Sequence, residues 1–396
     1  MDASTVIGVV GAGAMGAGIA QVAAMAGHPV VLCDARADAL PRAKAGMEKG
    51  LAKLVERGKL TPSQASEIVG RAQWVGPDSL GGPDLRPLAG AGLVIEAIVE
   101  DLATKRDLFV RLEQIVPPSA LLATNTSSLS VAAIASALAT PERMLGLHFF
   151  NPAPLMALVE VVGGVRTAPT VMEQGTTLMR AWGKVPVRTA DTPGFIVNRV
   201  ARPFYGEALR LLEEGVADPS TIDHAMRTLG GFKMGPCELM DFIGHDINFA
   251  VTRSVWEQTF HEPRYRPSLA QQRLVEAGWL GRKTGRGFYD YASGATPPAP
   301  LDDARVHARI FGRIIAMLVN EACEAVLLGI ASPGDIELAM TRGVNYPQGL
   351  LAWGDALGPQ RLVDTLRALQ QELGPERYRP SAHLTRCAAD GRSLLG

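Results

Sequence analysis

The pattern of hydrophobic and polar positions changes midway along the chain. The first half alternates short apolar runs, typical of buried strands, with stretches in which apolar residues recur three or four positions apart, typical of helices. The expected strands cover residues 5–10, 28–34, 91–97, 120–125, 144–150, 157–162 and 185–189. The expected helices cover the residues after Gly16 to about 26, residues 38–59, a stretch beginning near 61–62, and 104–115. This alternation predicts a mostly parallel sheet with helices on both faces.

The second half of the chain has a different pattern. After Thr192-Pro193-Gly194 the sequence is almost entirely of helical character, which places a domain boundary near 187–193. The stretch ASGATPPAP at 292–300 is rich in proline, glycine and small residues and indicates an extended linker. We therefore expect three domains, at residues 1–188, 189–291 and 301–396.

The last domain repeats the middle one. VADPSTIDHAM at 216–226 aligns with IASPGDIELAM at 330–340, an offset of 114 residues. The same register pairs Glu207 with Glu321, Gly235 with Gly349 and Asp241 with Asp355, and the sequence RYRPS occurs at 264–268 and again at 377–381. The expected fold class is an α/β domain followed by two related all-α domains.

Composition excludes several classes of partner. The 396 residues contain 39 Lys and Arg and 40 Asp and Glu, so the net charge of −1 gives no reason to expect a nucleic acid or a membrane surface. No apolar run approaches the roughly 20 residues of a membrane helix. The four cysteines are far apart and form no CxxC pair, so neither a disulfide framework nor a metal site is expected. The N-terminus has no signal-peptide pattern, and the cytoplasm is the expected location.

A glycine-rich motif lies between the first strand and the first helix. It has the pattern G-x-G-x-x-G and consists of Gly11, Ala12, Gly13, Ala14, Met15 and Gly16. In this context the glycines allow a tight turn, close approach of a pyrophosphate and close packing of the helix. Asp34, 21 residues after Gly13, ends the second strand and can bind the adenosine ribose. With its flanking strands and helix, the motif predicts an α/β Rossmann-type dinucleotide-binding domain. The expected cofactor is NAD, although Arg36 leaves NADP open because an arginine there could meet a 2′-phosphate.

A histidine and a glutamate occupy the last expected strands. His148 ends one strand and Glu160 follows twelve residues later in the next. Oxidation of an alcohol needs a base for the hydroxyl proton, and an imidazole held by a carboxylate suits that role. From spacing alone, however, a single histidine in an apolar strand is more often a hydrogen-bonded core residue, and this alternative stays open.

The chain resembles the short-chain L-3-hydroxyacyl-CoA dehydrogenase family over residues 4–291. The motifs that carry the resemblance are GAGAMGAGIAQVAA, VIEAIVEDLATKRDLF, NTSSL, GLHFFNPAP, LVEVV, TPGFIVNR, MGPCELMDFIG and GRKTGRGFY. The second helical domain resembles that of the longer members of the family. RVARPFYGEAL and GHDINFAVTRSV are similar to the phenylacetate-pathway branch, which acts on 3-hydroxyadipyl-CoA.

The resemblance implies a reaction and a site. The reaction is NAD-dependent oxidation of (S)-3-hydroxyacyl-CoA to 3-oxoacyl-CoA, as in β-oxidation and phenylacetate catabolism, with 3-hydroxybutyryl-CoA or 3-hydroxyadipyl-CoA as substrate. His148 is implied to be the base and Glu160 its partner, while Ser127 and Asn198 hold the substrate oxygens. The residues implied to lie near the cofactor are Glu100, Lys105, Asn125, Ser127, Asn151 and Lys283. Alternatively, Glu100 and Lys105 form a solvated pair, Asn198 bonds within its helix and Lys283 is a surface charge.

The chain departs from the family pattern at two places. Where the family often has a serine and a lysine on coenzyme A, this chain has Gly50 and Arg57, and Lys53 is an equal candidate for the contact. The second helical copy has Gly312 in place of Asn198 and ends before any KTGRGFY segment, so we expect it to have no catalytic role.

The resemblance leaves other questions open. The protein is either a homodimer or a monomer whose fused helical copy replaces a partner's domain. Two other functions compete with the thioester dehydrogenase. One is a dehydrogenase of a free hydroxy acid, of the gulonate type, and the other is a non-enzymatic, crystallin-like nucleotide-binding protein.

Overall fold

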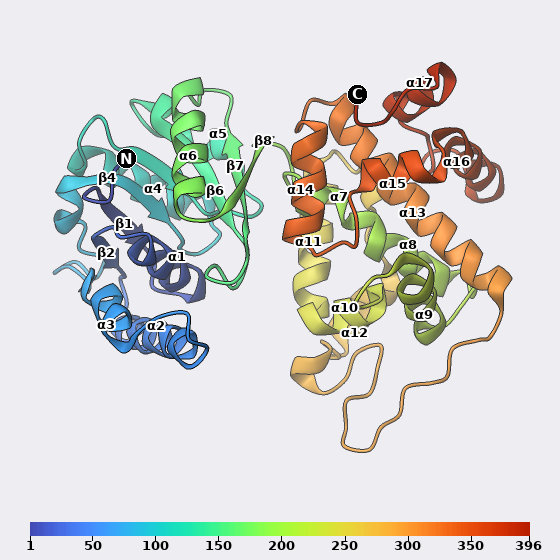
Figure 1. Ribbon diagram of the computed structural model, residues 1–396, viewed down its shortest axis with the longest axis horizontal. Coiled ribbons are helices and arrows are strands. Elements are labelled where there is room, and N and C mark those ends of the chain that lie inside the picture. The colour runs from blue at the N-terminus through green and yellow to red at the C-terminus, as the bar shows by residue number, and fades with distance from the viewer. The chain divides into compact units, whose positions relative to one another are not determined.

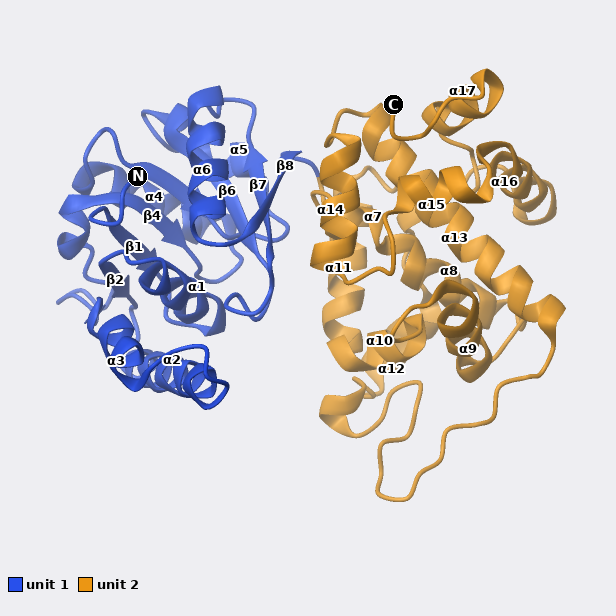
Figure 2. Ribbon diagram, viewed as in Figure 1, with its two compact units in different colours: residues 1–192 blue, residues 193–396 orange.

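The computed structural model describes residues 1–396 and contains two compact units, residues 1–192 and 193–396 (Figure 2). The division falls within the region where the sequence changes from alternating strands and helices to helices alone. No helix in either unit combines the length and the apolar character that a membrane crossing needs. Both helical copies lie in the second unit, and their separation into domains 189–291 and 301–396 stays a prediction.

The first unit is built on one eight-stranded sheet, drawn in blue to green in Figure 1. Its strands are β1 (Val6–Val10), β2 (Val30–Cys33), β3 (Ala72–Val75), β4 (Ala91–Glu96), β5 (Leu121–Thr124), β6 (Met144–Phe149), β7 (Leu158–Gly163) and β8 (Val185–Ala190). Their order is β3-β2-β1-β4-β5-β6-β7-β8, and every neighbouring pair is parallel except β6 and β7. The mostly parallel sheet is confirmed.

Helices cover both faces of this sheet. They are α1 (Ala14–Met25), α2 (Ala39–Glu56), α3 (Pro62–Gly70), α4 (Leu102–Ile115), α5 (Val131–Ala135) and α6 (Pro169–Ala181), with short 3₁₀ turns η1 (Arg86–Gly90) and η2 (Pro141–Arg143). One core cluster joins residues of α1, α2, α3 and α6 to the sheet, and another joins α4 and α5 to it. Sequence analysis missed β3, because this edge strand of four residues contains no fully buried side chain and hence no apolar run.

The second unit is entirely helical. Its helices are α7 (Val197–Val200), α8 (Arg202–Glu213), α9 (Pro219–Gly230), α10 (Pro236–Ile243), α11 (His245–Gln258), α12 (Leu269–Glu276), α13 (Ala304–Leu327), α14 (Pro333–Gly343), α15 (Leu350–Leu357), α16 (Pro359–Leu373) and α17 (Ala382–Asp390), with η3 (Pro263–Tyr265) and η4 (Arg282–Thr284). Residues 292–303 connect the copies without helix or strand, as the linker composition predicts.

The repeat in sequence is a repeat in structure. Helices α14, α15 and α16 begin 114 residues after α9, α10 and α11, and α17 begins 113 residues after α12. The long helix α13 ends 114 residues after the end of α8, so its C-terminal half is the equivalent of α8. The duplicated helical pattern is therefore confirmed.

The two copies contact each other through equivalent residues. Arg199 of the first copy donates from Nε to Glu321 Oε1 of the second, at 2.9 Å. Arg313, which is Arg199 moved by 114 positions, donates from Nε to Glu207 Oε2 of the first copy, at 2.8 Å. Tyr265 and Tyr378, which are also equivalent, donate their hydroxyls to Glu321 and Glu207. Equivalent residues of the two copies thus form both halves of their contact, as they do in the isologous interface of a twofold-symmetric dimer.

Candidate active site

The glycine-rich loop has the geometry of a dinucleotide-binding turn. Gly11 has a φ of +107°, and a Cβ there would lie 2.4 Å from the carbonyl oxygen of Ala97. A Cβ at Gly16 would lie 1.7 Å from the carbonyl oxygen of Gly11, so this glycine allows α1 to pack against the turn. A Cβ at Gly13 would meet no protein atom within 4 Å. The open space at Gly13, just before the first N–H groups of α1, fits a pyrophosphate.

Asp34 follows β2 beside this loop. Its carboxylate accepts hydrogen bonds from the backbone N–H of Ala12 at 2.6 Å and of Arg36 at 2.7 Å. A pocket of about 710 Å³ opens here, with the apolar Ile98 and Val99 among its lining residues. A carboxylate for ribose hydroxyls next to apolar side chains for a flat base suits the adenosine half of NAD. The guanidinium of Arg36 lies 4.0 Å from Asp34 and is largely exposed.

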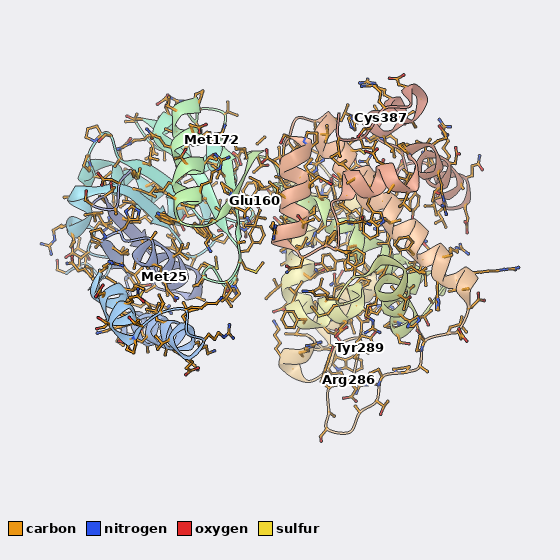
Figure 3. The ribbon with its side chains drawn as sticks, viewed as in Figure 1. Met25, Glu160, Met172, Arg286, Tyr289 and Cys387 are labelled. Atoms are coloured by element: carbon orange, nitrogen blue, oxygen red, sulfur yellow. The ribbon has the colours of Figure 1, made fainter.

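His148 and Glu160 lie directly opposite each other on β6 and β7. Because these strands are antiparallel, twelve residues of separation bring the two side chains to the same face, where His148 Nδ1 lies 2.6 Å from Glu160 Oε2. Figure 3 labels Glu160 among the side chains of the first unit. Both side chains are buried. A proton on Nδ1 that is held by the carboxylate makes Nε2 the nitrogen that can accept a proton. The pairing allows the histidine to act as a general base.

Glu100 organises the turn that contains Ser127. Its Oε1 accepts hydrogen bonds from the hydroxyls of Thr126 (2.6 Å) and Ser128 (2.9 Å) and from the backbone N–H of Ser127 (3.0 Å). Burial alone would raise the pKa of Glu100, but Lys105 and these donors outweigh it and hold the pKa below its ordinary value. Glu100 therefore stays ionised and fixes the backbone around Ser127.

Lys105 connects Glu100 to a buried glutamate that sequence analysis missed. Its ammonium lies 2.5 Å from Glu96 Oε1 and 3.2 Å from Glu100 Oε2, and its side chain is only 1% exposed. The solvated-pair alternative for Glu100 and Lys105 is wrong, because the lysine is inside the unit. Glu96 also accepts a hydrogen bond from the Thr124 hydroxyl at 2.6 Å. An acid as the last residue of the apolar run LVIE was the signal that could have revealed it.

The remaining predicted residues of the first unit follow β5 and β6. The side-chain oxygen of Asn125 accepts the backbone N–H of Phe149 at 2.8 Å and so ties the end of β5 to the residue after His148. Asn151 lies exposed in the loop that follows β6. Asn125, Ser127 and His148 thus gather at the carboxyl ends of neighbouring strands, the edge where α/β sheets bind ligands.

A second pocket, of about 830 Å³, lies along α1 and α2. Five cationic residues and no carboxylate line it, namely Arg36, Arg42, Lys53, Arg57 and Lys59. Both predicted coenzyme A contacts, Lys53 and Arg57, are among them, while Arg42 and Lys59 were not anticipated. A Cβ at Gly50 would lie 3.1 Å from Gln21 Oε1, so the Gln21 amide stands where a side chain at position 50 would point.

The predicted site residues of the second unit belong to its first copy. Asn198 lies in α7, and its carbonyl oxygen accepts a hydrogen bond from Arg202 Nε at 2.7 Å. Lys283 lies in η4, half-exposed, with its ammonium 2.6 Å from Asp246 Oδ1 in the first turn of α11. The contacts of Asn198 with the substrate and of Lys283 with the cofactor stay predictions. No group of three or more His, Cys, Asp or Glu side chains is arranged to hold a metal ion.

Comparisons with known proteins agree with this geometry. The family described as 3-hydroxyacyl-CoA dehydrogenase, NAD binding domain, matches residues 6–192. The 3-hydroxyacyl-CoA dehydrogenase C-terminal domain matches two segments, 194–291 and 310–393. Among curated proteins, the 3-hydroxyadipyl-CoA dehydrogenase of Escherichia coli K12 is 42% identical, with 96% of each chain covered. A probable 3-hydroxybutyryl-CoA dehydrogenase of Deinococcus radiodurans is 44% identical over 72% of this chain and 99% of its own length.

Solved structures extend the comparison to the fold. The crystal structure of a 3-hydroxybutyryl-CoA dehydrogenase from Escherichia coli K12 has a TM-score of 0.90 and 41% identity, and the match covers 98% of this chain and 99% of that one. The (S)-3-hydroxybutyryl-CoA dehydrogenase of Ralstonia eutropha has a TM-score of 0.69 and 36% identity over 73% of this chain and 99% of its own. The chain therefore belongs to the 3-hydroxyacyl-CoA dehydrogenase family and is an NAD-dependent enzyme of that family.

Proposed function

We propose that this dehydrogenase oxidises the 3-hydroxyl of a short-chain or dicarboxylic acyl-CoA, with 3-hydroxybutyryl-CoA and 3-hydroxyadipyl-CoA as the two candidate substrates. The observation that carries the proposal of a thioester substrate is the pocket along α1 and α2, which is lined by five cations and no carboxylate. Phosphates are the groups that such a lining attracts. A free hydroxy acid has no phosphate, so in the gulonate-type alternative only the pyrophosphate of the cofactor, at Gly13, would meet these five cations.

The chemistry needs a base that is neutral before the reaction and stable when protonated. When bound, NAD accepts the hydride that leaves C3 of the substrate. His148 takes the hydroxyl proton on Nε2, and Glu160, 2.6 Å from Nδ1, stabilises the imidazolium that results. A retained base and partner in this arrangement also argue against the non-enzymatic alternative.

Other residues hold the substrate and the cofactor in place. Ser127, in the turn fixed by Glu100, donates its hydroxyl to the 3-oxygen, and Asn198 holds the substrate oxygens from the helical unit. Asp34 binds the adenosine ribose, while Asn125, Asn151, Glu100, Lys105 and Lys283 surround the rest of the cofactor, with Glu100 and Lys105 acting through the backbone that they order. Positioning of this kind supplies several kcal/mol of the barrier reduction in enzymes.

We expect NADH to be consumed with acetoacetyl-CoA and not with free acetoacetate, and kcat/KM to be higher for 3-hydroxybutyryl-CoA and 3-hydroxyadipyl-CoA than for long-chain esters. Arg57→Ala should raise KM for the thioester about tenfold, because it removes a charged partner of a phosphate. The matched control is Lys44→Ala, because Lys44 is an exposed lysine of α2, the helix that Arg57 follows, and lies outside the pocket. Equal rates with acetoacetate, or no difference between the two variants, would contradict the proposed substrate class.

We further propose that the protein is a monomer in which the second helical copy takes the place of a partner's domain. The reciprocal pairs Arg199 with Glu321 and Arg313 with Glu207 support it, because they already satisfy both halves of a twofold interface within one chain. We also propose a cytoplasmic location. The four cysteines are buried free thiols, and free thiols are typical of proteins in a reducing compartment.

Light scattering on the full chain is expected to give the mass of one subunit at micromolar concentration. A fragment of residues 1–300 should aggregate or self-associate, since removal of the second copy exposes apolar surface and leaves Glu207 without Arg313. A stable dimer of the full chain, or a well-behaved monomeric fragment with full activity, would contradict this assignment.

A further inference from the structure

One buried arginine has no acidic partner. The chain buries six arginines, and five of them have a carboxylate within 4.0 Å, namely Arg143, Arg199, Arg210, Arg264 and Arg313. Arg202, the first residue of α8, is 6% exposed and forms no ion pair. Burial accordingly lowers its pKa, and only the electrostatic interaction with Tyr205 and Tyr346 opposes the effect. A buried cation without a counter-charge is unfavourable unless a ligand supplies one.

The groups around Arg202 hold it in place without neutralising it. Nε donates to the carbonyl oxygen of Asn198 at 2.7 Å, and Nη1 donates to the Thr252 hydroxyl at 3.1 Å. The guanidinium lies over the ring of Tyr205, 4.8 Å from its centroid. The nearby Tyr346 hydroxyl is buried and has no hydrogen-bond partner. The cluster therefore offers a fixed positive charge and an unused O–H donor.

The duplicated helices separate structural residues from ligand-binding ones. The ion-pair residues Arg199 and Glu207 recur in the second copy as Arg313 and Glu321. Asn198 does not recur, because Gly312 stands at its equivalent position, and Ala316 stands at the equivalent of Arg202. Arg202 is thus retained with the predicted substrate-binding residue and absent from the copy that lacks it. This pattern is expected of a residue that serves a ligand rather than the fold.

The spacing along the helices fits a short diacid. Arg202 follows Asn198 by four residues, and its Nε bonds to the Asn198 carbonyl, so the two residues lie one helical turn apart, or about 6 Å along an axis. Asn198 is expected to hold the oxygens near C1 and C3 of the acyl group. In a six-carbon diacid the second carboxylate follows C3 by three carbons, so it can reach the next turn of the same face.

We propose that Arg202 binds the terminal carboxylate of a dicarboxylic 3-hydroxyacyl-CoA, with the Tyr346 hydroxyl as a second donor. The inference rests on the proposed function and narrows its two candidate substrates to the dicarboxylic one. A guanidinium can bind a carboxylate through two parallel hydrogen bonds, which discriminates strongly against an acyl chain that ends in a methyl group. Because Tyr346 belongs to the second helical copy, that copy would contribute to substrate choice.

The test compares kcat/KM for 3-hydroxyadipyl-CoA and 3-hydroxybutyryl-CoA in matched variants. Arg202→Met should lower the value for the adipyl ester about 10²-fold and change that for the butyryl ester less than about threefold. Arg210→Met is the control, because Arg210 is a buried arginine of the same helix that bonds to the carbonyls of Gly206 and Arg266. It should leave the ratio of the two values unchanged.

Tyr346→Phe provides a variant that disturbs the fold least, since its hydroxyl has no partner to lose. It should lower the adipyl-to-butyryl ratio about fivefold. Equal losses with both esters in Arg202→Met, or an unchanged ratio in Tyr346→Phe, would overturn the inference while leaving the dehydrogenase intact. Absence of activity with either ester in the unaltered protein would instead overturn the proposed function.

Discussion

The variant His148→Gln is expected to lower kcat by about 10²–10⁴-fold while the affinity for NAD stays nearly unchanged. Glutamine can occupy the space of the imidazole and bond to Glu160, but it cannot accept the hydroxyl proton at neutral pH. The dinucleotide turn lies between β1 and α1, and β4 and β5 separate β1 from the strand that carries His148, so binding of the pyrophosphate and the adenosine has no reason to change. Steady-state turnover and NADH fluorescence titration measure the two quantities separately.

A second buried histidine provides the control for this variant. His28 is also buried in the first unit, and its Nδ1 lies 3.0 Å from the carbonyl oxygen of Thr5. His28→Gln should keep near-normal turnover, because the ring of His28 bonds to the backbone of Thr5 and contacts none of the predicted site residues. Near-normal turnover in His148→Gln would contradict the role of His148 as the base. A comparable loss of kcat in both variants would indicate general destabilisation of the first unit.

The variant Glu321→Gln is expected to lower the free energy of unfolding of the helical unit by about 3–5 kcal/mol. Glu321 is buried and lies 2.9 Å from Arg199 Nε and 3.4 Å from Arg264 Nη1, and it also accepts the Tyr265 hydroxyl. Loss of its charge leaves the buried guanidinium of Arg199 without a carboxylate, while Arg264 keeps Glu324 at 3.7 Å. Urea denaturation followed by circular dichroism would measure the effect.

Two further substitutions show whether burial is the cause. Glu207→Gln, the symmetry-related variant, should also be destabilising but should cost less, because Arg313 keeps a second carboxylate, Glu214, 2.5 Å from its Nη1. Glu372→Gln breaks the exposed pair with Arg309 and should cost less than about 1 kcal/mol. If Glu321→Gln were no more destabilising than Glu372→Gln, the reciprocal network would not hold the two copies together.

The sequence predicts local features of this protein well. The glycine motif and Asp34 depend on spacing within one βαβ unit, and the structure places both at the same turn. The helical repeat was visible because it preserves glycines, prolines and acids in one frame. These features share a cause, since each is set by residues that are close in the chain or by a direct duplication of it.

Non-local features could not be predicted in the same way. Whether Glu160 meets His148 depends on the antiparallel pairing of β6 and β7 in a sheet that is otherwise parallel. Glu96 was missed and Lys105 was left with two interpretations, because only the fold shows that the lysine is buried between two carboxylates. Arg202 is notable because no carboxylate lies beside this buried cation, and a sequence cannot show which partner a side chain lacks.

The reciprocal contacts of Arg199 and Arg313 have a consequence for how this enzyme can change over time. In a symmetric homodimer every substitution occurs in both subunits, so neither half of the assembly can lose its active site without the other. Here the two halves are encoded separately and tethered, and their local concentration does not depend on dilution. One half can therefore lose its catalytic residues and acquire another function, while the contacts that stabilise both halves are kept.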